Sequence, residues 1–163
     1  MENKICGATD IALTERGHQQ AIETGKLIVE QGLQFDEILT SPLIRASETA
    51  RHISEITGVP MRIELRLIEQ NFGKYESTAR NGDEFQKAKQ HFLDRYGTGE
   101  SMMRLGQRIY NLLDDIRKED KKTYLLVAHN GIARVIQSYF FDMTNEEYAS
   151  FGVKNCAVME YTW

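Results

Sequence analysis

Apolar residues recur at helical spacing in several stretches of the chain, and short apolar runs lie between those stretches. Ala21, Gly25 and Ile28, for example, fall three or four residues apart and predict one buried helix face after Thr14, a suitable N-cap. The same pattern predicts helices over 14–31, 42–58, 83–96 and 101–118, another after residue 131 and a short one opening at Thr144. Strands are predicted at 37–39, 61–65, 123–128 and 157–161.

The order of these elements alternates helices with strands along most of the chain. Such alternation is typical of βαβ units, whose strands form a largely parallel sheet. Residues 123–128 (TYLLVA) are almost continuously apolar, as expected for a strand buried on both faces of such a sheet. No linker rich in proline, glycine or serine divides the sequence, so we expect an α/β fold with one domain over residues 1–163.

Composition narrows the class of protein further. Of the 163 residues, 41% are hydrophobic and 27% are charged, which suits a folded core and excludes a disordered chain. The formal net charge of −4 argues against a nucleic-acid partner. No apolar run approaches the roughly 20 residues that span a bilayer, and the start lacks a signal peptide, so we expect a cytoplasmic protein without a membrane partner. Cys6 and Cys156 lie too far apart to indicate a zinc site.

Polar segments follow two of the predicted strands. In open α/β sheets, ligands bind beyond the carboxyl ends of the strands. Ser41 and Pro42 suit the N-cap and first position of a helix, which places Arg45 in its first turn, where it favours an anion. His129 follows the buried strand directly. Either residue alone is more often a surface charge or a structural histidine, but together they indicate a small anionic site.

Five segments of the chain resemble motifs of the histidine phosphatase (phosphoglycerate mutase-like) family. Residues 40–50 (TSPLIRASETA) are similar to the family's second-arginine motif, and residues 125–134 (LLVAHNGIAR) to its second-histidine motif. Residues 7–21, 67–76 and 99–101 also fit, in the expected order. The resemblance covers nearly the whole chain and implies a three-layer α/β/α sandwich with a mostly parallel sheet.

The resemblance also implies a mechanism and a set of site residues. Family members transfer a phosphoryl group to a histidine on the first strand, and water or a second hydroxyl then cleaves the phosphohistidine. In this sequence Arg45 and His129 would hold the phosphoryl oxygens, and Glu69 would protonate the leaving oxygen. Three further residues fall where family members line the pocket: Cys6, Gly7 and Asn130. No metal and no cofactor are implied, because arginines supply the positive charge.

The sequence departs from the family at its start. The signature Arg-His-Gly, which ends the family's first central strand, does not occur, and Met1-Glu2-Asn3 corresponds to a point beyond it. We therefore expect an N-terminally truncated domain that lacks its first central strand and nucleophile and is impaired as an enzyme. A late start codon, a fragment, or a neighbouring chain that fills the gap would each explain this. His18, His52 and His91 fall in predicted helices, where we expect solvent-facing or structural roles.

Several functions remain open on this evidence. The short stretch 74–99 favours a phosphatase acting on small phosphomonoesters over a phosphoglycerate mutase, since family mutases carry a long insertion there. A non-catalytic phosphate-binding or regulatory pseudoenzyme is an alternative, and an interaction protein with exposed strand edges is another. The expected partner is a small phosphorylated metabolite or inorganic phosphate. The oligomeric state stays open, a homo-oligomer included.

Overall fold

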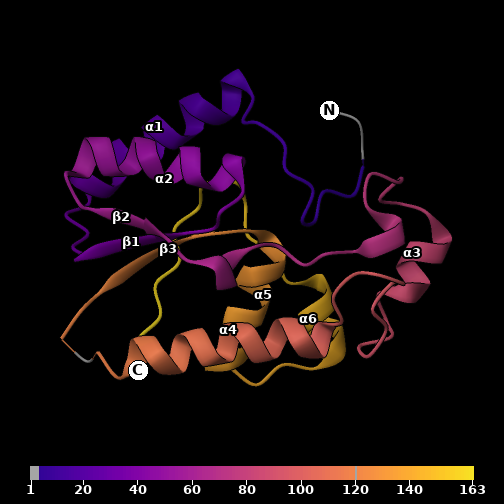
Figure 1. The fold of residues 1–163 in the computed structure, drawn as a ribbon. Helices are drawn as coiled ribbons and strands as arrows, with labels where there is room; N and C mark the ends of the chain where they lie inside the picture. Colours follow the sequence, from indigo (N-terminus) through magenta and orange to yellow (C-terminus); the bar gives the residue numbers. More distant parts are fainter. Residues whose placement is uncertain (1–3, 120) are drawn as a thin grey trace.

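Helices cover both faces of a parallel sheet in the computed structural model, which describes residues 4–119 and 121–163 (Figure 1). The helices are α1 (Glu15–Glu30), α2 (Ile44–Thr57), α3 (Asp83–Ala88), α4 (Met102–Arg117), α5 (Asn130–Phe140) and α6 (Asn145–Ser150). The strands are β1 (Glu37–Thr40), β2 (Met61–Ile63) and β3 (Tyr124–Val127), and two 3₁₀ turns are η1 (Leu65–Leu67) and η2 (Gly73–Tyr75). The start Met1-Glu2-Asn3 lies outside the described residues. None of the described helices is long and apolar enough to cross a bilayer.

The sheet has the strand order β2-β1-β3, and both pairings are parallel. Successive residues of β1 point to opposite faces, so each face is buried against a different pair of helices. Ile38 packs with residues of α1 and α2, whereas Leu39 packs with residues of α4 and α5. Figure 1 shows the resulting three layers, with α1 and α2 on one side and α4, α5 and α6 on the other. The predicted α/β/α sandwich with a parallel sheet is confirmed.

The helix ends follow the capping residues in most cases. The Thr14 hydroxyl accepts a hydrogen bond from Gly17 N at the start of α1, and Thr144 forms the predicted capping box with Glu147. Gly58 ends α2 in the left-handed conformation, with φ of 73°. The predicted start of α2 at Pro42 is wrong by two residues. Ser41 remains hydrogen-bonded to β3, which keeps the next residues extended and delays the helix to residue 44.

The helix predicted over 83–96 is much shorter, because α3 ends at Ala88. The chain beyond it forms turns that close at Tyr96, which has a positive φ of 56°. The Asp94 carboxylate accepts a hydrogen bond from Tyr96 N at 2.8 Å, a local bond that competes with helix formation. His91 therefore lies outside a helix, contrary to the sequence prediction, and is exposed.

The strand predicted at 157–161 does not form. The sheet of the described residues consists of β2, β1 and β3, and this segment pairs with none of them. A strand exists only where a neighbouring backbone supplies a ladder of hydrogen bonds. Here the segment contacts α5 through side chains instead: the Tyr161 ring stacks on Phe140 with centroids 4.9 Å apart, and its hydroxyl donates to Gln137 Oε1 at 2.8 Å. Strand β2 also ends earlier than predicted, at residue 63, since Leu65 begins η1.

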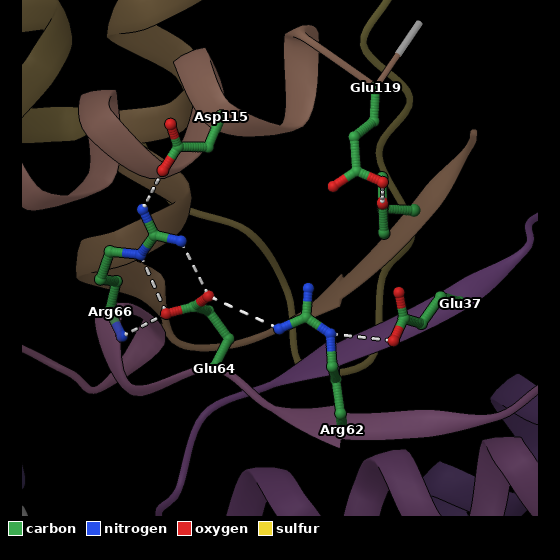
Figure 2. A network of polar contacts seen from close by, with 7 residues as sticks. Glu37, Arg62, Glu64, Arg66, Asp115 and Glu119 are labelled. Atoms are coloured by element: carbon green, nitrogen blue, oxygen red, sulfur yellow. Dashed lines mark hydrogen bonds and ion pairs between the residues drawn. The ribbon is translucent and has the colours of Figure 1, made fainter. Parts of the chain in front are cut away.

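A chain of charged side chains ties the sheet to α4 (Figure 2). Arg62 of β2 contacts Glu37 of β1 at 2.9 Å and Glu64 at 3.8 Å. Arg66 in η1 contacts Glu64 at 3.0 Å and Asp115 of α4 at 2.7 Å. The hydrogen bonds from Arg66 lower the pKa of Glu64. Because η1 lies two residues before Glu69, this network also fixes the start of the loop that carries a predicted site residue.

Candidate active site

Strands β1 and β3 deliver two polar side chains to the same edge of the sheet. Thr40 pairs with Val127 in the parallel register, so the residues that follow both strands emerge side by side. Ser41 is fully buried, and its Oγ lies 2.8 Å from His129 Nε2. His129 is also the N-cap of α5. The predicted placement of residues 41 and 129 together beyond the strand ends is therefore what the structure shows.

Arg45 lies in the first turn of α2 and is partly buried. Its Nη1 donates to the Thr9 carbonyl and its Nη2 to the Gly7 carbonyl, both at 2.8 Å. Burial lowers the pKa of Arg45, and the charges of Glu69 and other acidic neighbours oppose that shift. A guanidinium pKa lies so high that Arg45 keeps its charge in either case. Arg45 thus carries a fixed positive charge that acts electrostatically on Glu69.

Glu69 is buried, with 8% of its surface exposed. One carboxylate oxygen accepts a hydrogen bond from Gln70 N and the other from Gly131 N, each at 2.9 Å. Gly131 belongs to the first turn of α5, where helix N–H groups attract negative charge. Burial nevertheless raises the pKa of Glu69, because desolvation outweighs these two N–H groups and the charge of Arg45. A carboxyl group of raised pKa can hold the proton that a general acid delivers.

Gly131 permits this close approach. A Cβ atom added at position 131 would lie 2.4 Å from Glu69 Oε1. Sequence reasoning treated Gly131 only as part of a turn. The structure shows that its lack of a side chain gives the Glu69 carboxylate access to the first turn of α5.

The pKa of His129 is strongly lowered. Burial, together with the positive charges of Arg45 and Arg108, lowers the pKa of His129 to about 3. The imidazole is therefore neutral near pH 7, with one nitrogen as donor and the other as acceptor. A neutral imidazole can donate one hydrogen bond to a phosphoryl oxygen without adding charge.

Residues 7–9 form a bridge between Arg45 and a second carboxylate, that of Glu76. The backbone N–H groups of Gly7, Ala8 and Thr9 donate to Glu76 at 3.1 to 3.3 Å, and the Thr9 hydroxyl donates to it at 2.5 Å. A Cβ at Gly7 would lie 2.2 Å from the Gln70 carbonyl oxygen, so glycine is required for the chain to pass here. Of the predicted pocket residues, Gly7 thus contacts Arg45 through its carbonyl.

Cys6 and Asn130 were predicted to line the same pocket. Cys6 is partly buried and directly precedes Gly7, whose carbonyl accepts a hydrogen bond from Arg45. The Asn130 side chain contacts a different segment: its Nδ2 donates to the Val153 carbonyl and its Oδ1 accepts from Val153 N, both at 2.9 Å. Asn130 therefore fixes the chain after α6 to the start of α5.

Arg108 of α4 supports the loop before Glu69, and the sequence analysis missed it. Its guanidinium pairs with Glu100 at 2.8 and 2.9 Å, and donates to the carbonyls of Arg66 and Ile68. Glu100, the partner of Arg108, lies in segment 99–101, which resembles a family motif. That resemblance was the only sequence signal that pointed to this contact. Arg108 is eight residues further along the chain and carried no pattern of its own. Its charge acts on both Glu69 and His129.

Comparisons with known proteins show the family of this chain. The sequence model of the histidine phosphatase superfamily (branch 1) matches residues 1–163. The chain is 32% identical over 165 residues to a 2,3-bisphosphoglycerate-dependent phosphoglycerate mutase of Bartonella tribocorum, covering 92% of this chain and 79% of that protein.

Solved structures share the fold. A mycobacterial glucosyl-3-phosphoglycerate phosphatase, which has also been solved with inorganic phosphate, gives a TM-score of 0.81 at 20% identity, covering 95% of this chain and 81% of that one. The α-ribazole phosphatase of Shigella flexneri gives 0.79 at 23% identity, covering 94% and 79%. With the family match spanning the whole chain, this protein belongs to the histidine phosphatase superfamily.

Proposed function

We propose that this chain provides the phosphate-binding and proton-donating half of a phosphatase-type site for small phosphomonoesters. The observation that carries the proposal is the buried Glu69 carboxyl, of raised pKa, placed at the first turn of α5 near the charge of Arg45. In the proposed reaction Arg45 and His129 hold the phosphoryl oxygens, and Glu69 gives its proton to the leaving oxygen. Positioned donors of this kind stabilise the charge that develops in phosphoryl transfer.

The guanidinium of Arg45 can bind an anion without releasing residues 7–9. It carries five N–H donors in a planar fork, and the carbonyls of Gly7 and Thr9 each accept from one terminal nitrogen. These carbonyls hold the guanidinium in one orientation before a ligand arrives. A preoriented arginine loses less side-chain entropy on binding phosphate.

The nucleophile of the proposed reaction is not among His18, His52 and His91, which lie away from this site. The family's chemistry uses the histidine of an Arg-His-Gly sequence, which these 163 residues do not contain. His18 and His52 contact each other between α1 and α2, and His91 is exposed after α3. We therefore propose that a protein made of these residues alone binds phosphate but is impaired in turnover, and that a strand ending in Arg-His-Gly would complete the site.

A non-catalytic phosphate-binding protein is the second candidate, and the same absence of Arg-His-Gly favours it. The two candidates differ in whether the site turns over substrate once a nucleophile is supplied. The mutase named among the relatives is a third activity, which we place behind phosphatase because only the short segment 74–99 separates Gly73 from Glu100.

The test compares this chain with a version that carries an added N-terminal strand ending in Arg-His-Gly. Inorganic phosphate binding is measured by calorimetry, and turnover with p-nitrophenyl phosphate. We expect both proteins to bind phosphate and only the extended one to hydrolyse the ester. His129→Ala in the extended protein should reduce turnover by about 10²-fold or more, as expected for loss of a preorganised donor.

His91→Ala is the matched control, because it removes an exposed histidine and should leave turnover unchanged. Phosphate binding without turnover by a folded extended protein would favour the non-catalytic candidate. Turnover that is insensitive to His129→Ala would contradict the proposed site.

A further inference from the structure

Two histidines and a glutamate meet between α1 and α2, on helices and not at the strand ends. His18 lies in the first turns of α1, and Glu48 and His52 lie four residues apart on α2, which puts them on one face of that helix. One ligand atom from each of the three residues lies within 4.8 Å of the others. The sequence predicts only solvent-facing or structural roles for His18 and His52, because each falls within a predicted helix beside polar neighbours and not at a strand end.

The two imidazoles are arranged so that their ring nitrogens face each other. His18 Nδ1 and His52 Nε2 are 2.9 Å apart, and the rings are nearly perpendicular, with centroids separated by 5.2 Å. In a tetrahedral zinc site, Zn–N bonds of about 2.0–2.1 Å place two ligand nitrogens roughly 3.3 Å apart. A movement of about half an ångström would therefore admit a metal ion between these nitrogens.

The surroundings of the cluster resemble the outer shell of metal sites. When His52 ligates through Nε2, its proton is on Nδ1, and Nδ1 lies 3.9 Å from Glu55 Oε2. Ligating histidines usually donate the proton of their second nitrogen to a carboxylate, and a shortening of this separation by about 1 Å would make that hydrogen bond. Arg51 contacts both Glu48 and Glu55 at 2.7 Å and so orients the two carboxylates. Two carboxylates and one guanidinium leave a local charge of about −1, which favours a cation.

We propose that His18 Nδ1, His52 Nε2 and a carboxylate oxygen of Glu48 form a binding site for a divalent transition metal, zinc in particular. Two imidazoles with one carboxylate suit zinc, and the fourth tetrahedral position is left to water. The side chains of His52 and Glu48 are 15% and 34% exposed, so an ion reaches the site from solvent while the ligands remain held by their helices.

Metal binding here would join α1 to α2. The chain before α1 contains Gly7 and Thr9, whose carbonyls accept hydrogen bonds from Arg45 at the start of α2. The bound ion therefore acts on the same helix pair that frames the phosphate-binding arginine, at a separate set of residues. This inference does not depend on the proposed phosphatase activity, since metal binding is measured directly.

The test uses chelator-treated protein without a polyhistidine tag. Zn²⁺ binding is followed by calorimetry, Co²⁺ binding by the visible absorption of tetrahedral cobalt, and stability by thermal unfolding. We expect one ion per chain and a higher Tm with Zn²⁺. His18→Gln and His52→Gln should each weaken binding by tenfold or more, and Glu55→Gln by about tenfold through the orientation of His52.

His91→Gln is the control, because it removes an exposed histidine elsewhere and should leave the affinity unchanged. Circular dichroism verifies that each variant is folded before binding is compared. The proposal is overturned if the folded protein binds no Zn²⁺ with one-to-one stoichiometry. It is also overturned if His18→Gln and His52→Gln bind as tightly as the unaltered chain.

Discussion

Glu69 is buried and His129 is partly buried, yet loss of contact with water shifts their pKa values in opposite directions. Desolvation penalises the charged form of each group, so it raises the pKa of the acid and lowers that of the imidazole. Both side chains are thereby kept closer to their neutral forms in the same small volume. One neutral group can donate a proton, and the other can donate a hydrogen bond.

The lowered pKa of His129 predicts an acid-sensitive contribution to stability. In the unfolded chain the pKa of a histidine is about 6.5, whereas the pKa of His129 in the folded protein is about 3. Between these pH values the unfolded chain binds more protons, so stability rises with pH through this window and falls as pH decreases. His129→Gln should reduce that slope by up to about 1.4 kcal/mol per pH unit in urea unfolding measured from pH 4 to 7. His91→Gln should keep the original slope, and equal slopes for all three proteins would contradict the assigned burial.

Gly131 offers a second prediction at the same scale. Replacing a helical glycine by alanine ordinarily stabilises a helix by about 1 kcal/mol. At Gly131 the new Cβ would meet Glu69 Oε1 at 2.4 Å, and that buried carboxylate is held by two N–H groups. We expect Gly131→Ala to lower the free energy of unfolding by about 1–3 kcal/mol and to weaken phosphate binding. Gly106→Ala in α4, where the added Cβ meets nothing within 4 Å, should be neutral or stabilising by contrast.

Individual site residues differed in how far the sequence could predict them. Arg45 and His129 follow strands, so hydrophobic pattern and strand-end logic indicated both. Glu69 was found only through resemblance, because an acidic residue in a loop has no pattern. The supporting contacts of Arg108 and Glu76 could not be predicted, since each joins segments far apart in the sequence.

At the scale of elements, α1 and α2 pack closely through Gly25. A Cβ added there would lie 2.8 Å from Ile56 Cδ1 and 3.2 Å from Ile56 Cβ. Gly25→Ala should therefore lower Tm despite the higher helix propensity of alanine. We expect the free energy of unfolding to fall by about 1–3 kcal/mol. Thermal unfolding of this variant beside Gly106→Ala measures the difference. A stabilised Gly25→Ala protein would show that the two helices can separate at little cost.

Several helix ends that depend on local capping were predicted well, whereas the strand at 157–161 was not. Thr14, Gly58 and the Thr144–Glu147 box mark helix ends by bonds within one turn, so the sequence contains the necessary information. The segment 157–161 has the composition of a strand, but strand formation depends on a neighbouring backbone. No composition reveals whether that neighbour is present, and the segment instead packs on α5 through aromatic side chains.

At the scale of the whole molecule, the layered architecture follows from the alternation of helices and strands, which the sequence displays directly. The three-layer arrangement was expected and is confirmed. The candidate site was predictable in outline only, because it is assembled where the ends of β1 and β3 meet the loops before α1 and after η1. Its details depend on which backbone groups these loops turn toward one another.

The contacts of the site join distant parts of the chain, and this has a consequence for the order of folding. Ser41 and His129 are 88 residues apart in sequence, Gly7 and Glu76 are 69 apart, and Glu69 and Gly131 are 62 apart. Closing such loops costs entropy before their contacts provide stability, so contacts of this kind form slowly. Neighbouring helices α1 and α2 and the strands around them can associate first. The proposed anion site would then be completed last, so that phosphate binding would report the completed fold.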